Sequence, residues 1–101
     1  MALTTRVWGK DPEDADYRTF DWLALGFLAP GETITASTWD VPVGSGLTQP
    51  ASASNTTTTT TIWLGGGTLN TEDTLYRVKN TITTSAGRTL IKSWYVYVRE
   101  D

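Results

Sequence analysis

In the last quarter of the chain, mostly apolar positions alternate with polar ones with a period of two. Within residues 76–83, the even-numbered positions form one face and the odd-numbered positions, all basic or threonine, form the other. This period is typical of a strand with one buried face, because successive side chains of a strand point to opposite sides. A second run places Trp94, Val96 and Val98 on one face. Gly87 lies between the runs and can adopt the positive φ of a tight reversal, so the pattern predicts a long antiparallel hairpin.

Upstream segments carry shorter strand patterns. Residues 17–22 alternate, and residues 32–41 continue as a strand whose change of parity near residues 37–38 predicts a β-bulge. Residues 47–54 contain a proline, which restricts them to an edge-like strand. These spacings predict an all-β fold of about seven short strands.

Two segments are ambiguous. Residues 56–61 are six consecutive threonines, which suit either a flexible linker or a strand; we favour the strand, because threonine is β-branched and the run leads into Ile62. Residues 23–30 are apolar, but a glycine and a proline interrupt them, so we expect a buried crossover or a short 3₁₀ turn. No segment predicts a convincing helix. The whole pattern favours one immunoglobulin-like antiparallel β-sandwich.

The chain divides into two parts by composition. Residues 1–16 combine breakers with charges, which indicates an N-terminal arm, and residues 17–101 form the sandwich domain. Trp8 is expected to be exposed or bound to a partner, because it is an aromatic residue in a polar arm. Tyr76 stands at the start of the penultimate strand, where such sandwiches place a tyrosine whose hydroxyl bonds to upstream backbone. A plain core tyrosine is the alternative.

Composition narrows the possible chemistry. The 101 residues include no histidine and no cysteine, which removes the commonest general base, thiolate nucleophiles and the usual zinc ligands. The net charge of −3 and the lack of a basic stripe argue against a nucleic-acid partner. No apolar run approaches the roughly 20 residues that span a bilayer, and no signal peptide is visible. We therefore expect a soluble protein made in the cytoplasm, with no membrane partner.

Catalytic and metal sites are poorly supported. Asp21, Glu32 and Asp40 lie near aromatic residues, and paired carboxylates could serve a glycosidase, but all three stand in ordinary strand or turn contexts. The acidic residues between positions 11 and 16 lack the glycine and the distal glutamate of an EF-hand loop. We expect no enzymatic activity, no cofactor and no metal site.

Partner binding is the better-supported chemistry. Tyr95, Tyr97 and Arg99 share the strand face opposite the apolar one, and tyrosine and arginine are enriched in interface hot spots. Ordinary cross-strand pairing on a solvated sheet is the alternative. Trp8 is the fourth candidate partner-binding residue. The remaining tryptophans fall within predicted strands, which favours core packing: Trp22, Trp39, Trp63 and Trp94.

Several segments together resemble a known family. Three stretches, taken in this order, are similar to small fiber-tail adaptor proteins of tailed phages and prophages. They are Lys10-Asp-Pro-Glu-Asp-Ala-Asp-Tyr17, Thr38-Trp-Asp-Val-Pro42 and Ala86-Gly-Arg-Thr89. The resemblance covers nearly the whole chain. Residues 25–31 replace a shorter, more polar link of that pattern, and the loop 69–73 is longer, so the partner-facing loops differ.

The resemblance implies a virion structural protein with an immunoglobulin-like sandwich. It would be made in the bacterial host cytoplasm, stand in several copies around the tail and link fibers or tailspikes to tail or neck proteins. It carries no catalytic residues to transfer. Two rival functions stay open: a capsid decoration or cement protein, and a carbohydrate-binding module that would need an exposed aromatic platform.

Overall fold

The computed structural model describes residues 7–70 and 75–100, and these residues form eight strands and no helix. The predicted all-β class is confirmed. Residues 1–6 of the predicted arm and residues 71–73 of the predicted longer loop 69–73 lie outside the described residues. The strands are β1 (Val7–Lys10), β2 (Asp16–Asp21), β3 (Ile34–Asp40), β4 (Leu47–Thr48), β5 (Ser54–Asn55), β6 (Thr59–Gly66), β7 (Tyr76–Thr84) and β8 (Thr89–Val98).

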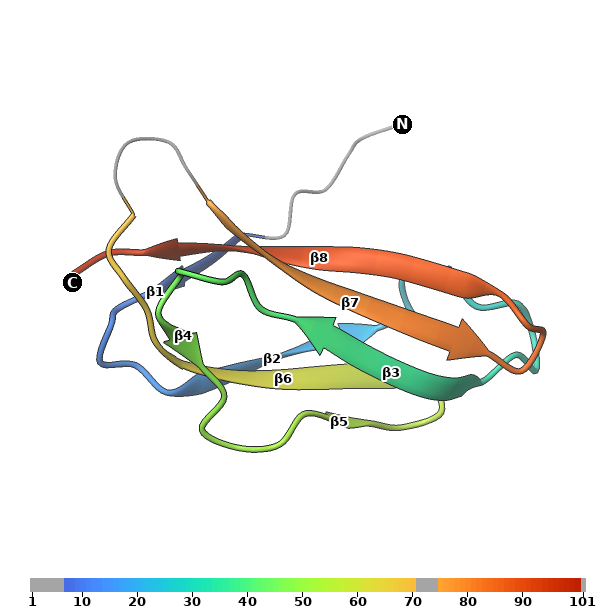
Figure 1. Ribbon diagram of the computed structural model, residues 1–101. Coiled ribbons are helices and arrows are strands. Elements are labelled where there is room, and N and C mark those ends of the chain that lie inside the picture. The colour runs from blue at the N-terminus through green and yellow to red at the C-terminus, as the bar shows by residue number, and fades with distance from the viewer. Residues whose placement is uncertain (1–6, 71–74, 101) are drawn as a thin grey trace.

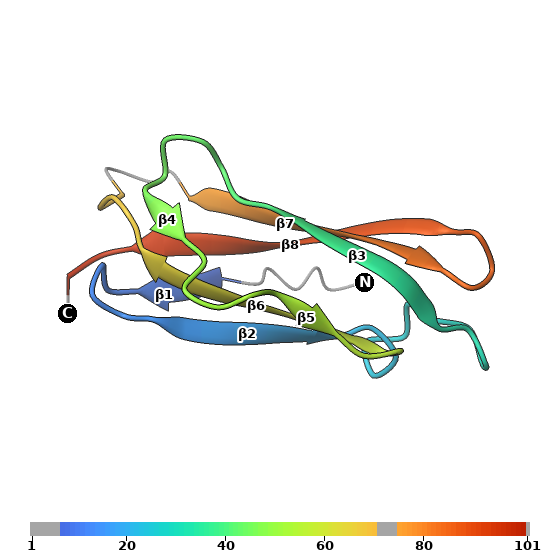
Figure 2. The same cartoon turned by 60° about the horizontal axis from the view of Figure 1, so that its bottom comes forward.

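The strands form two sheets that lie face to face (Figures 1 and 2). One sheet has the order β1-β8-β7-β3, and the other has the order β2-β6-β4, with β5 also paired to β6. In the immunoglobulin arrangement strands C, F and G share one sheet and strands B, E and D the other. Here β3, β7 and β8 correspond to strands C, F and G, and β2, β6 and β4 correspond to strands B, E and D. The predicted immunoglobulin-like sandwich matches this topology.

The closing hairpin is the longest paired unit of the fold. β7 and β8 pair antiparallel from Tyr76 opposite Val96 to Thr83 opposite Thr89. The reversal follows Thr84, where Gly87 has a φ of 80° and its N–H donates to the Thr84 carbonyl at 2.9 Å. Most inward side chains of the two strands are buried as the alternation predicts, while Leu90 and Trp94 are half-buried. This hairpin therefore supplies the scaffold of the first sheet.

The start of the chain departs from the prediction. Residues 7–10 form β1, which pairs parallel with β8, so this part of the predicted arm belongs to the sandwich and the sandwich is not wholly antiparallel. Trp8 and Lys10 point inward while Val7 and Gly9 are exposed, which is the period-two pattern of a strand. Gly9 and the charged Lys10 hide that pattern in the sequence. Only the acidic segment that follows acts as a connection to β2.

Two other predicted features, the bulge and the start of the threonine strand, lie at different residues in the structure. The predicted bulge exists, but the register shifts between Ile34 and Ala36 instead of near residues 37–38. As a result Trp39 faces the core and Ala36 is exposed. The threonine run begins with a turn, in which the Thr56 N–H donates to the Thr59 carbonyl at 2.8 Å, and β6 starts only at Thr59. The strand prediction for residues 56–61 is therefore correct for the second half of the run alone.

The apolar link after β2 is a series of turns with a mixed surface. The N–H groups of Leu25, Gly26 and Phe27 donate to the carbonyls of Asp21, Leu23 and Trp22, each at 3.0 Å. This link buries Trp22 and Leu28 but leaves Leu23 and Leu25 about half exposed. The predicted crossover is thus only partly buried, since tight turns direct alternate apolar side chains outward.

The interior holds two apolar clusters, both contacted by Trp39 and Trp94. The members of the first are Trp8, Ile62, Leu64, Val78, Val96 and Val98, and those of the second are Phe20, Trp22, Leu28, Ile34 and Ile82. The predicted core placement is correct for Trp22, Trp39 and Trp94. The two clusters together form one continuous layer between the sheets.

A buried chain of hydrogen bonds crosses this layer. The Trp22 indole N–H donates to Thr60 Oγ1 at 2.9 Å, and the Thr60 hydroxyl donates to Asn80 Oδ1 at 2.6 Å. Asn80 Nδ2 then donates to Ser37 Oγ and to the Thr38 carbonyl, both at 2.9 Å. Buried polar groups need such partners, so this chain fixes how β2, β6, β7 and β3 face one another.

Candidate functional site

Tyr95 and Tyr97 lie on the outer face of the β1-β8-β7-β3 sheet, as the alternation predicts. Both are half-buried, while Val96 and Val98 point inward and are fully buried. Arg99 is exposed, and its guanidinium carbon lies 5.8 Å from the centre of the Tyr97 ring. The predicted sharing of one face by these three side chains is confirmed. Their role in partner binding stays a prediction.

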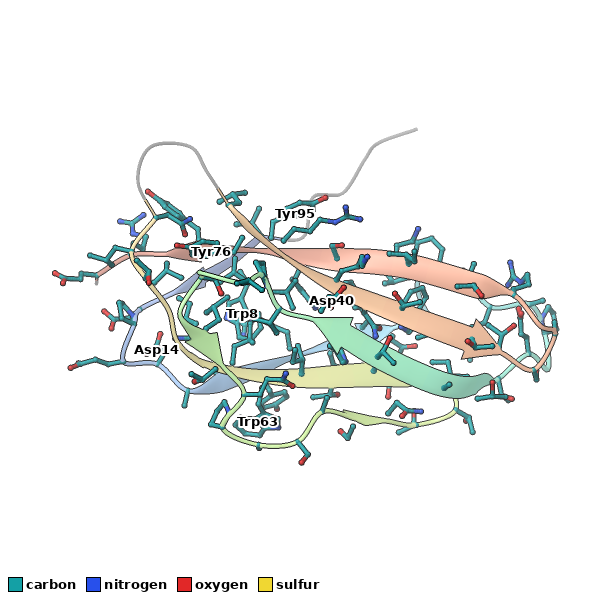
Figure 3. All side chains as sticks on the ribbon, viewed as in Figure 1. Trp8, Asp14, Asp40, Trp63, Tyr76 and Tyr95 are labelled. Atoms are coloured by element: carbon teal, nitrogen blue, oxygen red, sulfur yellow. The ribbon has the colours of Figure 1, made fainter. Side chains whose placement is uncertain are left out.

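The register of the sheet surrounds Tyr95 with residues from both neighbouring strands. Val7 of β1 lies opposite Tyr95 on one side, and Arg77 of β7 lies opposite on the other. The Arg77 guanidinium is held in place, since its Nε donates to Ser93 Oγ at 2.9 Å. Figure 3 shows Tyr95 on the outer side of this sheet, with Trp8 between the sheets. A row of aliphatic, aromatic and cationic groups therefore crosses three strands.

The same face of the sheet ends in a groove. This groove has a volume of about 510 Å³, within the ~300–1,000 Å³ range of ligand sites. Its rim carries an ion pair, in which Lys79 Nζ lies 3.7 Å from Asp40 Oδ2. Val43 on the rim has a fully exposed side chain. The groove is lined by Asp40, Val41, Pro42, Val43, Leu75, Tyr76, Arg77 and Lys79.

Trp8 does not belong to this surface, and the expectation that it is exposed is wrong. The residue is 1% exposed and packs in the first core cluster. Its ring meets the Trp94 ring edge to face with centroids 6.3 Å apart, and the Arg18 guanidinium lies 4.8 Å from its centre. Burial of a tryptophan contributes much more to folding than a surface contact does. Trp8 therefore anchors β1 to the core.

The prediction that Trp63 packs in the core is also wrong. Its neighbours Ile62 and Leu64 are fully buried, so Trp63 points to the outer face of the second sheet (Figure 3). There it meets Tyr17, its partner across β2 and β6, with ring centroids 4.9 Å apart and planes 41° apart. Tyr17 is 49% exposed. The alternation within residues 59–66 holds the signal for this outward position.

The three carboxylates considered for catalysis are held in separate settings. Glu32 is buried and accepts hydrogen bonds from Arg88 Nε at 2.8 Å and from the Ala29 N–H at 2.8 Å. These bonds, with that of the Thr84 hydroxyl, lower the pKa of Glu32 from 4.5 to about 2. Asp21 is exposed and accepts from a backbone N–H of its own turn, and Asp40 pairs with Lys79.

Lys10 at the end of β1 is a cation with a buried side chain. Its Nζ donates to the carbonyls of Gly66 and Asp11, and burial lowers its pKa below the usual value of 10.5. The acidic segment after it folds into a turn, in which Asp11 and Asp14 accept backbone N–H groups of that same turn. These carboxylates therefore serve the local backbone structure.

Among residues 7–70 and 75–100, no cluster of three or more potential metal ligands occurs. No helix within these residues is long and apolar enough to cross a membrane. The described site is a protein surface, made of an aromatic and cationic sheet face beside a groove.

Fold and site together define a small immunoglobulin-like domain whose outer sheet face carries aromatic and cationic side chains. Residues 10–97 match the model of one protein family, described as podophage GP4 fiber-tail adaptor protein gp77. The chain belongs to this family of phage tail adaptors, and the resemblance in its sequence is confirmed. No curated protein matches the chain.

Proposed function

We propose that this protein is a non-enzymatic adaptor that joins tail fibers or tailspikes to the tail of the phage particle. Membership of the fiber-tail adaptor family supports a place in the tail over a place on the capsid. In this proposal the protein is made in the host cytoplasm and its partners are other structural proteins of the virion. Several copies surround the tail.

The outer face around Tyr95 is the observation that carries the docking proposal. Tyr95 and Tyr97 are half-buried, so part of each ring is already fixed by the sheet and little side-chain entropy remains to be lost on binding. Arg77 and Arg99 add cationic groups beside these rings. Rigid aromatic groups with neighbouring arginines are the residue types that dominate interface energetics.

Several copies per particle would let each contact be modest. A fiber that is held by more than one copy rebinds at a high effective concentration when one contact opens. The small area of this face on a 101-residue domain is then sufficient for a stable attachment. The mechanism needs rigid docking only, and no group of the site has to transfer a proton or an electron pair.

The test is to assemble particles with the double substitution Tyr95→Ala and Tyr97→Ala and to count fibers per particle by electron microscopy. We expect a loss of most fibers, because hot-spot truncation costs about 2 kcal/mol or more, roughly 30-fold in affinity for each contact. Tyr17→Ala is the matched control, as Tyr17 is a partly exposed tyrosine on the opposite sheet. Normal fiber numbers with the double variant would reject this face, and equal loss with the control would point to general destabilisation.

A further inference from the structure

The groove lies where one strand of the first sheet ends before its neighbour does. β3 and β7 pair in register as far as Asp40 opposite Lys79. β7 extends three residues beyond this point, to Tyr76. Continued pairing would bring Pro42 opposite Arg77, but proline has no N–H to donate to a ladder. The chain leaves the sheet here, and no backbone hydrogen bond of the described residues joins residues 41–43 to β7.

The departure leaves part of β7 with one open edge. Within residues 7–70 and 75–100, residues 76–78 pair with β8 on one side only, opposite Val96, Tyr95 and Trp94. Backbone N–H and C=O groups of successive residues in an antiparallel ladder point alternately to the two sides. Some of these groups in residues 76–78 therefore face the groove. An unpaired strand edge of this kind is a template for another strand.

The two sides of the groove differ in chemistry. On the outer face of the sheet stand Arg77 and Lys79, and Asp40 is the one anion among the lining residues that the structure describes. On the inner side stand Val41, which packs against the core, and the Tyr76 ring. The Asp40 side chain is 80% exposed at an ion-pair distance of 3.7 Å, so it only partly offsets the two cations. The groove is thus cationic outside and apolar inside.

We propose that this groove binds an extended, acidic peptide segment that adds to the sheet as a strand beside β7. Side chains of a strand alternate between faces, so the segment would carry an apolar residue, an acidic residue and an apolar residue in succession. The acidic side chain meets Arg77 and Lys79, and the apolar ones pack on Val41 and Tyr76. That this segment belongs to a neighbouring tail protein rests on the proposed function.

The groove also continues the docking face. Arg77 lines the groove and is the cross-strand neighbour of Tyr95. A strand added beside β7 would therefore stand next to whatever covers Tyr95. Its backbone hydrogen bonds would supply affinity, and the alternating side chains would supply specificity.

The test uses the full chain labelled with ¹⁵N and the peptide acetyl-Thr-Val-Glu-Val-Thr-amide. We expect saturable shifts of the amide resonances of residues 76–79 and slower hydrogen exchange of the β7 amides that face the groove. Arg77→Glu should weaken binding at least about tenfold, and a peptide with lysine in place of glutamate should recover binding to that variant. Lys92→Glu changes the net charge equally, lies opposite Asn80 away from the groove, and should bind the first peptide normally.

A second peptide separates strand addition from simple side-chain contact. Methylation of its backbone nitrogens removes the donors and keeps the side chains, so it should lose binding. Equal binding of the methylated peptide, or no shift at residues 76–79 up to millimolar peptide, overturns the proposal. If the Tyr95 and Tyr97 variants lose fibers while the peptide does not bind, the adaptor function stands without the added strand. The reverse result keeps the peptide site and rejects the docking face.

Discussion

Gly67 passes so close to Val98 that a Cβ on the glycine would lie 2.9 Å from Val98 Cγ2. Gly67 also has a φ of 111°, a conformation that residues with a Cβ rarely adopt. Gly67→Ala should therefore lower the free energy of unfolding by about 2–4 kcal/mol, from backbone strain and overpacking together.

Gly9→Ala is the matched control for that substitution. A Cβ at Gly9 would meet no atom within 4 Å, and Gly9 lies in an ordinary strand conformation. The free energy of unfolding of this variant should stay within about 0.5 kcal/mol of the parent. Urea denaturation followed by tryptophan fluorescence measures both variants, and equal effects would refute the contact between Gly67 and Val98.

The hydroxyl of Tyr76 donates to the carbonyl oxygen of Thr68 at 3.0 Å, which confirms the predicted tyrosine corner. Tyr76→Phe removes this hydrogen bond and keeps the ring, so unfolding should become easier by about 0.5–1.5 kcal/mol. Tyr97→Phe, on the outer face, should change stability by less than about 0.5 kcal/mol. Denaturant titrations of the two variants give the comparison, and a Tyr76→Phe protein as stable as the parent would contradict the corner.

The hydroxyl of Thr60 links the two halves of the buried polar chain. Thr60→Val keeps the shape of the side chain but leaves the Trp22 indole N–H and Asn80 Oδ1 without this partner. Each buried unsatisfied group costs about 1–3 kcal/mol, so the two groups together should lower the free energy of unfolding by about 2–6 kcal/mol, measured by calorimetry. Thr61→Val tests specificity, because Thr61 bonds to Thr19 on the exposed side of the same strands. Similar losses in both variants would argue against the buried chain.

Glu32 gives the stability a pH dependence of known sign. Its pKa is about 2 in the folded protein, against an ordinary value of 4.5. The folded state therefore binds fewer protons than the unfolded state between these values, and stability contributed by the Glu32 carboxylate is present above pH 4.5 and lost as the pH falls towards 2.

Glu32→Gln removes that contribution. The variant should be less stable than the parent at pH 7, and the difference should shrink steadily from pH 4.5 to pH 2. Thermal unfolding across this range measures it. Comparison of the two proteins cancels the effect of the other carboxylates, and a difference that stays constant with pH would refute the assigned pairing with Arg88.

Local pattern was sufficient to predict the closing hairpin and the face that carries Tyr95 and Tyr97. These features depend on alternation within one segment and on one turn glycine, which the sequence displays directly. Trp63 was predictable in the same way, since its buried neighbours Ile62 and Leu64 set its direction. Composition alone, which favours buried tryptophan, misplaced it.

Other features depend on residues that are distant in the chain. Lys10 gains its place in a buried strand from the Gly66 carbonyl, 56 residues away, so a local reading assigns it to solvent. Trp8 is buried because β1 finds β8, a pairing that no local period encodes. The groove likewise depends on the register between two separate strands, since continued pairing beyond Asp40 and Lys79 would place Pro42, which has no N–H, opposite Arg77.

The parallel pairing of β1 with β8 sets how the domain resists a pulling force. Val7 lies opposite Tyr95, and Lys10 lies opposite Val98, so the chain enters at one end of this pair and leaves at the other. Tension applied at Val7 and Val98 would slide the two strands along each other and load all their hydrogen bonds together, instead of opening them one at a time. If the proposed attachment of a fiber loads the domain at these two ends, this pair of strands would give way only when all its hydrogen bonds break together.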